Sequence, residues 1–203
     1  MATKKTETVS IKPLKIEVLQ ARIVGDTPLI MHQWSEKAKR QLLDKMMKVA
    51  STGREVKDPE AEYRASLYYL ELGGYGFPAT GIKAAMVRAA KGMGMVMKDM
   101  QCAIFVEPDD TTLVRLHGEP VMREDIVRVA NGAPDLRYRG EFKSWFMDLT
   151  IKYNAAVVSA DQVINMLNGA GFGVGIGEWR MEKGGQYGSF HVEIGRASCR
   201  ERV

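Results

Sequence analysis

Side chains suited to a nucleic-acid backbone lie in the glycine-rich segment Gly169–Phe190. Arg180 and Lys183 could meet phosphates, and the rings of Trp179 and Tyr187 could stack on bases. Glycine costs backbone entropy, so folded chains keep it where the backbone turns tightly or approaches a ligand closely. The glycines expected to form this loop are Gly173, Gly175, Gly177, Gly184, Gly185 and Gly188. A long connection without a ligand is the alternative interpretation.

Further cations could extend this site into a basic track that follows a phosphate backbone. They are Lys83, Arg88 and Lys91 on an expected helix, and Arg137 and Arg139 on an expected strand. Arg137 and Arg139 alternate with Tyr138, which places both guanidinium groups on one open sheet face. Surface Lys and Arg side chains are also ordinary solvated charges, and Glu178 and Glu182 lie close enough in sequence to offset the two cations of the loop.

The chain lacks the residue patterns of the common catalytic and metal sites. Its three histidines, His32, His117 and His191, have no metal-ligand spacing, and no Gly-Lys-Ser/Thr ending marks a phosphate-binding loop of the Walker type. We therefore expect a non-enzymatic protein with no metal and no cofactor. His32 is the one candidate for a general acid or base, and it carries the alternative prediction of a metal-independent endoribonuclease.

Hydrophobic periodicity predicts the elements that must position these residues. Strands are expected at 15–24, 103–106, 113–117, 125–130, 136–142, 145–153 and 187–193, and helices at 35–50, 81–91 and 159–168. Thr80 is the expected N-cap of the second helix, and Ser159 with Gln162 forms a capping-box pattern at the start of the third. Without a helical insertion at 35–72, this order is βαββαβ. It predicts an α+β fold with a ferredoxin-like antiparallel sheet and helices on one face.

Composition and length favour one domain in a reducing compartment. We expect a polar lead-in at 1–14, a single domain at 15–193, and a tail at 194–203 that resembles a translated sequencing adapter. The chain has 29 Lys and Arg against 25 Asp and Glu; because the tail holds three Arg and one Glu, the net charge without it falls from +4 to +2. Bulk charge therefore does not argue for an anionic partner. Cys102 is then the one cysteine, and no apolar run is long enough to span a membrane, so we expect a cytoplasmic protein without a membrane partner.

Two segments resemble motifs of the RAMP superfamily, and within it the backbone subunits of CRISPR effector complexes. Phe77–Ala90 (FPATGIKAAMVRAA) is similar to the segment that opens the first helix in that superfamily, and Gly175–Phe190 (GIGEWRMEKGGQYGSF) is similar to its glycine-rich loop before the last strand. Thr27–Met31 also resembles an early element of uncharacterised phage and prokaryotic RAMP-like proteins. The resemblance implies a RAMP fold and a long thumb hairpin, for which Glu107–Ala130 is the expected place.

The resemblance further implies that the chain binds single-stranded nucleic acid, RNA in preference to DNA, as a homo-oligomer or within a multi-subunit complex. The glycine loop and the basic sheet face would hold the phosphate backbone. Two alternatives belong to other classes: a RAMP-type endoribonuclease that uses His32, and a phage structural or assembly protein whose sheet and loop contact protein. Binding to RNA and DNA as the salt concentration rises separates these three.

Overall fold

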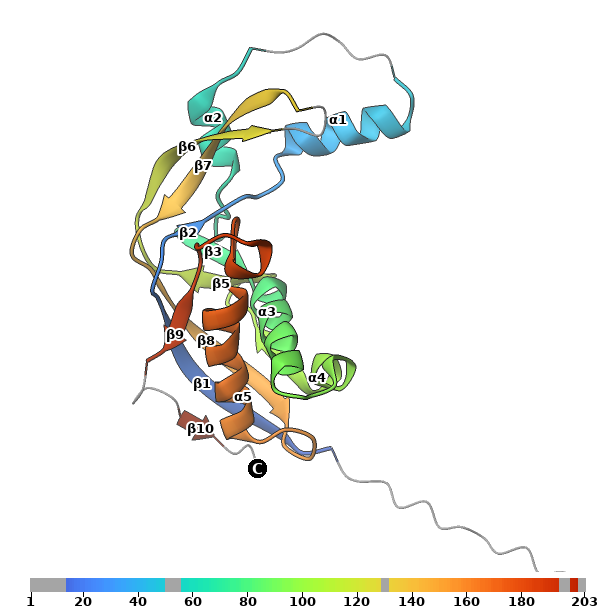
Figure 1. Cartoon of the computed structure of the whole chain (residues 1–203), viewed down its shortest axis with the longest axis vertical. Helices are drawn as coiled ribbons and strands as arrows, with labels where there is room; N and C mark the ends of the chain where they lie inside the picture. Colours follow the sequence, from blue (N-terminus) through green and yellow to red (C-terminus); the bar gives the residue numbers. More distant parts are fainter. Residues whose placement is uncertain (1–13, 50–55, 129–131, 194–197, 201–203) are drawn as a thin grey trace, which may run out of the picture.

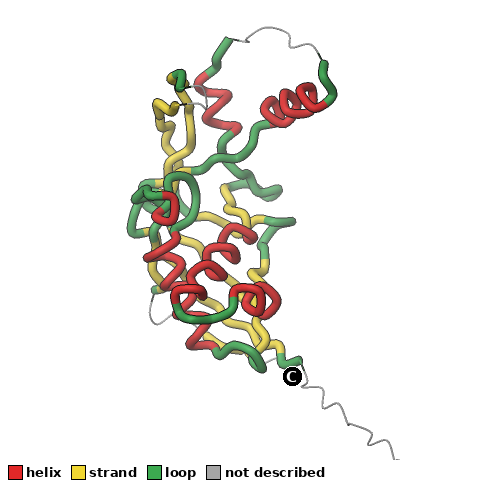
Figure 2. The backbone as a smooth tube through the Cα atoms, turned by 45° about the vertical axis from the view of Figure 1, so that its right-hand side comes forward, coloured by secondary structure: helices red, strands yellow, loops and turns green. Residues whose placement is uncertain are grey.

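The chain has the shape of a crescent, in which a sheet covered by helices forms one limb and a long hairpin forms the other (Figure 1). The computed structural model describes residues 14–49, 56–128, 132–193 and 198–200. α1 (Glu36–Met46) reaches across the concave side from the hairpin end, as the view turned by 45° also shows (Figure 2). The crescent therefore has an inner face, where elements from distant parts of the sequence lie opposite one another.

The main sheet is antiparallel throughout. It comprises β1 (Ile16–Gly25), β4 (Ile104–Glu107), β8 (Phe146–Asn154), β9 (Phe190–Val192) and β10 (Ser198–Arg200). β8 pairs with β4 and with one edge of β1, while β9 and β10 pair with different stretches of the other edge of β1. The alternating residues of β8 predict a half-buried strand, and this is confirmed, because Met147, Leu149 and Ile151 are at most 2% exposed.

Three helices cover one face of this sheet: α3 (Ala79–Gly92), α4 (Met97–Ala103) and α5 (Ala160–Gly169) (Figure 1). The prediction that Thr80 caps α3 is wrong. The helix begins at Ala79 with Pro78 as its N-cap, because the amide of Ala79 donates to the carbonyl of Thr112 at 3.0 Å and fixes the first turn there. The sequence pattern does not predict α4, which is short and has no side-chain cap.

α5 runs past its predicted end. The predicted capping box is confirmed, since Ser159 and Gln162 exchange hydrogen bonds at the first turn. Beyond Gly169 the chain continues into a π-helical turn, η1 (Ala170–Val174), so the start of the glycine-rich segment is helical. A Cβ at Gly171 would lie 1.8 Å from the carbonyl oxygen of Phe190. Glycine at this position therefore allows the turn to approach β9.

The second limb is built around the hairpin of β6 (Pro120–Arg128) and β7 (Pro134–Phe142), which β2 (Leu29–Ile30) extends in the order β2-β7-β6. α2 (Pro59–Ala65) lies along β7. β3 (Tyr75–Pro78) and β5 (Leu113–Leu116) form a separate two-stranded sheet. The stretch Glu107–Ala130, in which we expect a hairpin, contains the first strand of this hairpin but not the second.

α1 stands apart from the core. Ser35 caps it, as the expected helix at 35–50 indicates, by accepting a hydrogen bond from the amide of Ala38 at 3.1 Å. The helix buries no residue, and Leu42 and Met46 are 43% and 75% exposed. A surface helix ordinarily buries such apolar residues against its own domain. α1 instead presents them to solvent.

Two predicted domain boundaries fall largely outside the described residues. Of the lead-in at 1–14 the structure describes Leu14 alone, and of the tail at 194–203 it describes β10, which pairs with β1. The origin of the tail stays a prediction. Among the residues that are described, no helix combines the length and the apolar character needed to cross a membrane.

Candidate nucleic-acid interface

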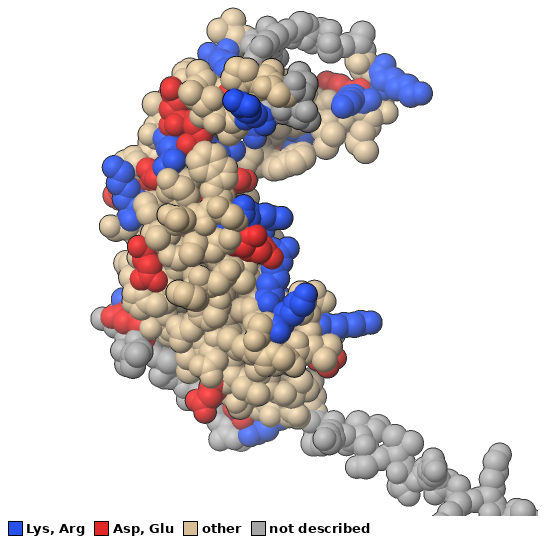
Figure 3. Space-filling model, in the orientation of Figure 1, with Lys and Arg blue, Asp and Glu red and all other residues tan. Residues whose placement is uncertain are grey.

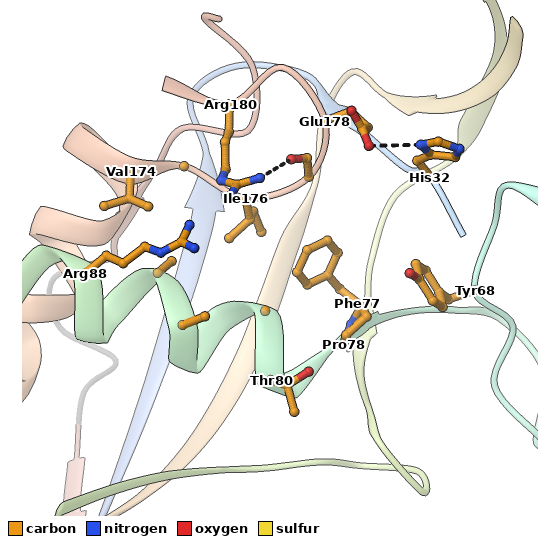
Figure 4. Close-up of a pocket in the computed structure, with 15 residues that line it drawn as sticks. His32, Tyr68, Phe77, Pro78, Thr80, Arg88, Val174, Ile176, Glu178 and Arg180 are labelled. Atoms are coloured by element: carbon orange, nitrogen blue, oxygen red, sulfur yellow. Dashed lines mark hydrogen bonds and ion pairs between the residues drawn. The ribbon is translucent and has the colours of Figure 1, made fainter. Parts of the chain in front are cut away.

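The loop after η1 lies against the first turns of α3, and a hollow of about 300 Å³ opens between them (Figure 4). Its lining includes Thr80, Gly81 and Arg88 of α3 and Gly175, Gly177 and Arg180 of the loop. The two segments that resemble RAMP motifs therefore meet in space, although about 90 residues separate them in sequence.

Several glycines fold this loop tightly on itself. Gly188 has a φ of 67°, and a Cβ there would lie 1.8 Å from the carbonyl oxygen of Ile176; a Cβ at Gly185 would lie 1.7 Å from that of Trp179. The amides of Ile176, Glu178 and Gly188 donate to protein carbonyls at 3.0, 3.0 and 2.9 Å. Of the other expected loop glycines, Gly173 lies in η1, Gly175 and Gly177 line the hollow, and Gly184 follows the 3-10 turn η2 (Met181–Lys183). Packing within the loop therefore requires glycine at Gly185 and Gly188, whereas a Cβ at Gly173 or Gly184 would meet nothing within 4 Å. The three amides are not offered to a ligand.

Two arginines from different elements point into the hollow (Figure 4). Arg88 comes from α3 and Arg180 from the loop. Arg180 pairs through Nη2 with Glu182 at 3.1 Å, and Arg88 pairs through Nη1 with the same carboxylate. The fold thus brings two of the predicted cations together, and Glu182 neutralises part of their charge.

His32 and Glu178 form a polar pair in the lining of the same hollow, with 2.9 Å between His32 Nδ1 and Glu178 Oε1 (Figure 4). The hydrogen bond with His32 holds the pKa of Glu178 below its usual value, against the opposing effect of burial. An imidazole oriented by a carboxylate is an arrangement that general acid–base catalysis uses. In the described part of the chain, no group of three or more His, Cys, Asp or Glu side chains is placed to hold a metal ion.

A second hollow, of about 1040 Å³, adjoins the first at His32, which lines both. α1, α2 and β7 form its sides, and Trp34 and Arg137 belong to its lining. Trp34 is 57% exposed, so its ring is open to a ligand. Sequence reasoning missed this residue, although a lone tryptophan between polar residues ahead of a helix cap is a signal for an exposed ring. Five Lys and Arg and four Asp and Glu line the hollow, so its charge is nearly balanced.

The two rings expected to stack on bases are in contact with an arginine that the sequence did not single out. Arg123 of β6 lies 5.6 Å from the ring centre of Trp179 and 4.9 Å from that of Tyr187. It also donates to Asp125, Glu141 and the hydroxyl of Tyr187 at 2.8, 2.8 and 3.2 Å. Burial lowers the pKa of Arg123, but these hydrogen bonds outweigh burial and leave the pKa above its usual value. The cluster ties the hairpin to the loop, so these rings hold the inner face together.

The prediction that Arg139 lies on an open sheet face is wrong. Arg139 is 3% exposed, with its Nη1 at 3.5 Å from Asp125 and its guanidinium carbon at 5.8 Å from the ring centre of Trp179. The loop covers this part of the hairpin, so the guanidinium lies inside. Arg137, two residues earlier, keeps a side chain that is 39% exposed and pairs with Asp135 at 3.5 Å.

The lysines of the predicted basic track lie outside both hollows. Among the described residues, Lys83, Lys91 and Lys183 form no ion pair; Lys91 and Lys183 are exposed and Lys83 is half-buried. Lys and Arg side chains gather along the concave edge of the crescent, over α3, α4 and the loop (Figure 3). These lysines could thus add positive charge around the inner face, although they line neither hollow.

The open face of the main sheet, opposite α3 and α5, carries charges that are already paired. Arg22 donates two hydrogen bonds of 2.7 Å to Asp148, and Lys152 pairs with Glu107 at 2.6 Å. The guanidinium of Arg22 also lies 4.5 Å from the ring centre of Phe146. These cations are therefore paired, although the ring of Phe105 on β4 is 51% exposed on the same face.

Comparisons with solved structures give several matches. A chain of a solved structure, described as the Type III-B Cmr-beta bound to cognate target RNA, matches this chain with a TM-score of 0.43 and 11% identity. The match covers 92% of this chain and 61% of that chain, so this chain spans less than two thirds of its length. No protein-family model and no curated protein matches the sequence.

Proposed function

We propose that this chain is a non-enzymatic subunit that binds single-stranded nucleic acid along the inner face of the crescent, with RNA preferred over DNA. The observation that carries the proposal is the sharing of one continuous face by Arg88 and Arg180 in the first hollow and the exposed ring of Trp34 in the second. Each nucleotide of a strand carries a phosphate and a base, so a face that presents both cations and exposed rings can bind the phosphates and stack on the bases. Unpaired bases can reach such a ring, whereas bases in a duplex are stacked inside it.

We also propose that the domain has the ferredoxin-like arrangement of the RAMP type, similar to CRISPR backbone subunits. In chain order its elements are β1, α3, β4, β8, α5 and β9, and the strands lie in the order β9-β1-β8-β4 with every pairing antiparallel. This is a βαββαβ order with the two helices on one face. The meeting of Phe77–Ala90 with Gly175–Phe190 in one hollow supports the same assignment, and the preference for RNA rests on this resemblance.

The exposed apolar side of α1 supports membership of a larger assembly. Within the described part of the chain neither Leu42 nor Met46 is buried, although a surface helix with such apolar residues normally buries them. We propose a homo-oligomer or a multi-subunit complex, in which a protein neighbour covers this helix.

A filter-binding titration of single-stranded RNA and DNA at several salt concentrations tests the proposal. The Arg180→Ala/Lys183→Ala variant should bind more weakly, and its log–log salt slope should flatten by about 0.7 for each phosphate that the variant no longer neutralises. Lys15→Ala/Lys152→Ala removes the same charge elsewhere and should bind like the unaltered chain. Absence of binding to either nucleic acid at low salt would contradict the proposal and leave the structural or assembly role.

A metal-independent endoribonuclease is the second candidate, and the pairing of His32 with Glu178 beside two arginines favours it. If the chain cleaves RNA without metal, His32→Ala should abolish cleavage. His191→Ala is the matched control, because His191 also pairs with a carboxylate, Asp26, at 2.6 Å but lines neither hollow. RNA that stays intact with the unaltered chain would rule this candidate out.

A further inference from the structure

Glu182 is held by two arginines that come from different elements. One of its oxygens, Oε2, accepts hydrogen bonds from Nε and Nη2 of Arg180 at 3.3 and 3.1 Å, and it also accepts one from Nη1 of Arg88. Glu182 and Arg88 are 94 residues apart in sequence. A carboxylate oxygen that two guanidinium groups share lies where one oxygen of a phosphate could accept from the same two arginines.

The turn that carries Glu182 is exposed and lies at the edge of the fold. η2 buries none of its residues, and the glycine that follows it, Gly184, has open space around its Cβ position. In the described part of the chain, the Glu182 carboxylate contacts no cation other than Arg88 and Arg180. Exposed ion pairs of this kind contribute little to stability, so an incoming anion could replace the carboxylate without unfolding the loop.

We propose that Arg88 and Arg180 form a phosphate subsite at the edge of the first hollow, and that Glu182 occupies this subsite while no strand is bound. The phosphodiester of a strand takes the position of the carboxylate, because its two unesterified oxygens can accept from the same guanidinium nitrogens. That the anion is a phosphodiester of a nucleic-acid strand rests on the proposed function. It goes beyond that function by naming the subsite and the side chain that competes for it.

The test compares Glu182→Gln, which keeps the shape of the side chain and removes its charge, with Glu193→Gln, which removes one carboxylate beside Arg22 on β1. Binding of a fluorescent uridine oligonucleotide is measured by anisotropy. Glu182→Gln should bind roughly five-fold more tightly, the order expected for removal of one like charge about 4 Å away in water. Glu193→Gln should bind like the unaltered chain. The gain should vanish in Arg88→Ala/Glu182→Gln, because the freed subsite then lacks one arginine.

A second probe, inorganic phosphate, separates the subsite from the proposed function. In Glu182→Gln, phosphate should shift the Nε–Hε NMR signals of Arg88 and Arg180 at concentrations that leave the unaltered chain unchanged. If the unaltered chain binds RNA but Glu182→Gln gains no affinity and shows no shifts, the subsite is wrong and the proposed function stands. If the shifts occur and no variant binds RNA, the subsite stands and the proposed function is wrong. Equal circular dichroism spectra and melting curves check that the variants are folded.

Discussion

The inner face of the crescent and the open face of the main sheet both carry cations and aromatic rings, but the cations of the two faces are paired in different ways. On the sheet face, Arg22 and Asp148 are direct partners in the register of β1 and β8, and their side chains satisfy each other. On the inner face, Trp34 is 57% exposed, and Arg88 and Arg180 meet only because α3 and the loop lie side by side. Antiparallel register therefore pairs charges across neighbouring strands, whereas tertiary structure brings two arginines of the inner face onto one shared carboxylate, Glu182.

This difference is the reason why we propose the inner face as the binding face. A cation already held by a cross-strand carboxylate must lose that partner to bind a phosphate, and a ring beneath a guanidinium must lose it to stack on a base. On the inner face, a phosphate would have to displace one carboxylate, that of Glu182, from Arg88 and Arg180. The ring of Trp34 is 57% exposed.

The largest loss of stability is expected from a change at the buried arginine of β7, Arg139. Arg139→Ala leaves Asp125, which is 5% exposed, with Arg123 alone, and should lower the free energy of unfolding by about 3 kcal/mol. Arg137→Ala on the same strand removes a half-exposed side chain and should change it by less than about 0.5 kcal/mol. Urea denaturation of the two variants checks this, and equal losses of stability would contradict the burial of Arg139.

The packing of the loop should give the next largest effect. Gly188→Ala places a Cβ 1.8 Å from the carbonyl oxygen of Ile176 at a φ of 67°, and should lower the free energy of unfolding by about 2 kcal/mol. Gly173→Ala is the control, because its Cβ meets nothing within 4 Å, and it should change stability by less than about 0.5 kcal/mol. Thermal melts of both variants measure the difference. A Gly188→Ala protein as stable as Gly173→Ala would mean that the loop is not folded in this way.

A smaller effect is expected from the exposed ring. Trp34→Ala should weaken binding of single-stranded RNA by about five-fold, the lower end of the range for removal of one stacking ring. Phe105→Ala is the counterpart on the open sheet face, where Phe105 is 51% exposed on β4, and it should leave affinity unchanged. Anisotropy titrations at one salt concentration suffice. A larger loss of affinity for Phe105→Ala would move the binding face to the sheet.

The smallest effect concerns acid pH. The pKa of Glu178 is lowered by its hydrogen bond with His32, so Glu178 adds stability that is present above its unfolded pKa and lost as pH falls through the lowered value. His32→Ala should therefore be less stable than the unaltered chain at about pH 6, with the difference narrowing towards about pH 3. Glu17, whose pKa is lowered by its hydrogen bond with Lys15, is the counterpart on β1. Lys15→Ala should show a weaker pH dependence, because that lysine is exposed to screening solvent. Urea midpoints across this pH range measure both, and a constant difference for His32→Ala would contradict the role of the pair.

Local features of the fold could be predicted from the sequence. The alternation in β8, the buried stripe of α3 and the serine caps at Ser35 and Ser159 each depend on residues within a few positions of one another. Their periodicity and capping chemistry act through short-range contacts, which a single sequence displays directly. The end of α5 could not be predicted in this way. Glycine at this point of the sequence predicts a loop, but Gly171 lies in a helical turn that packs closely against Phe190 of β9.

The candidate site could be predicted only in part, because its contacts join distant residues. His32 and Glu178 are 146 positions apart, and Arg123 and Tyr187 are 64 apart. The residue type identified Arg180 as a candidate cation, but it could not show that Arg180 and Arg88 share the carboxylate of Glu182. Alternation placed Arg139 on an exposed face, but the loop that covers this face comes from another part of the chain.

Photo-crosslinking of a single-stranded oligonucleotide that contains 4-thiouridine shows whether the strand lies on the inner face, because it reports which residues touch the strand. We expect crosslinks, located by mass spectrometry, at Trp34 or Tyr68, two aromatic residues that line the hollows of the inner face. Crosslinks confined to the open sheet face, for example at Phe105, would contradict the proposed binding face.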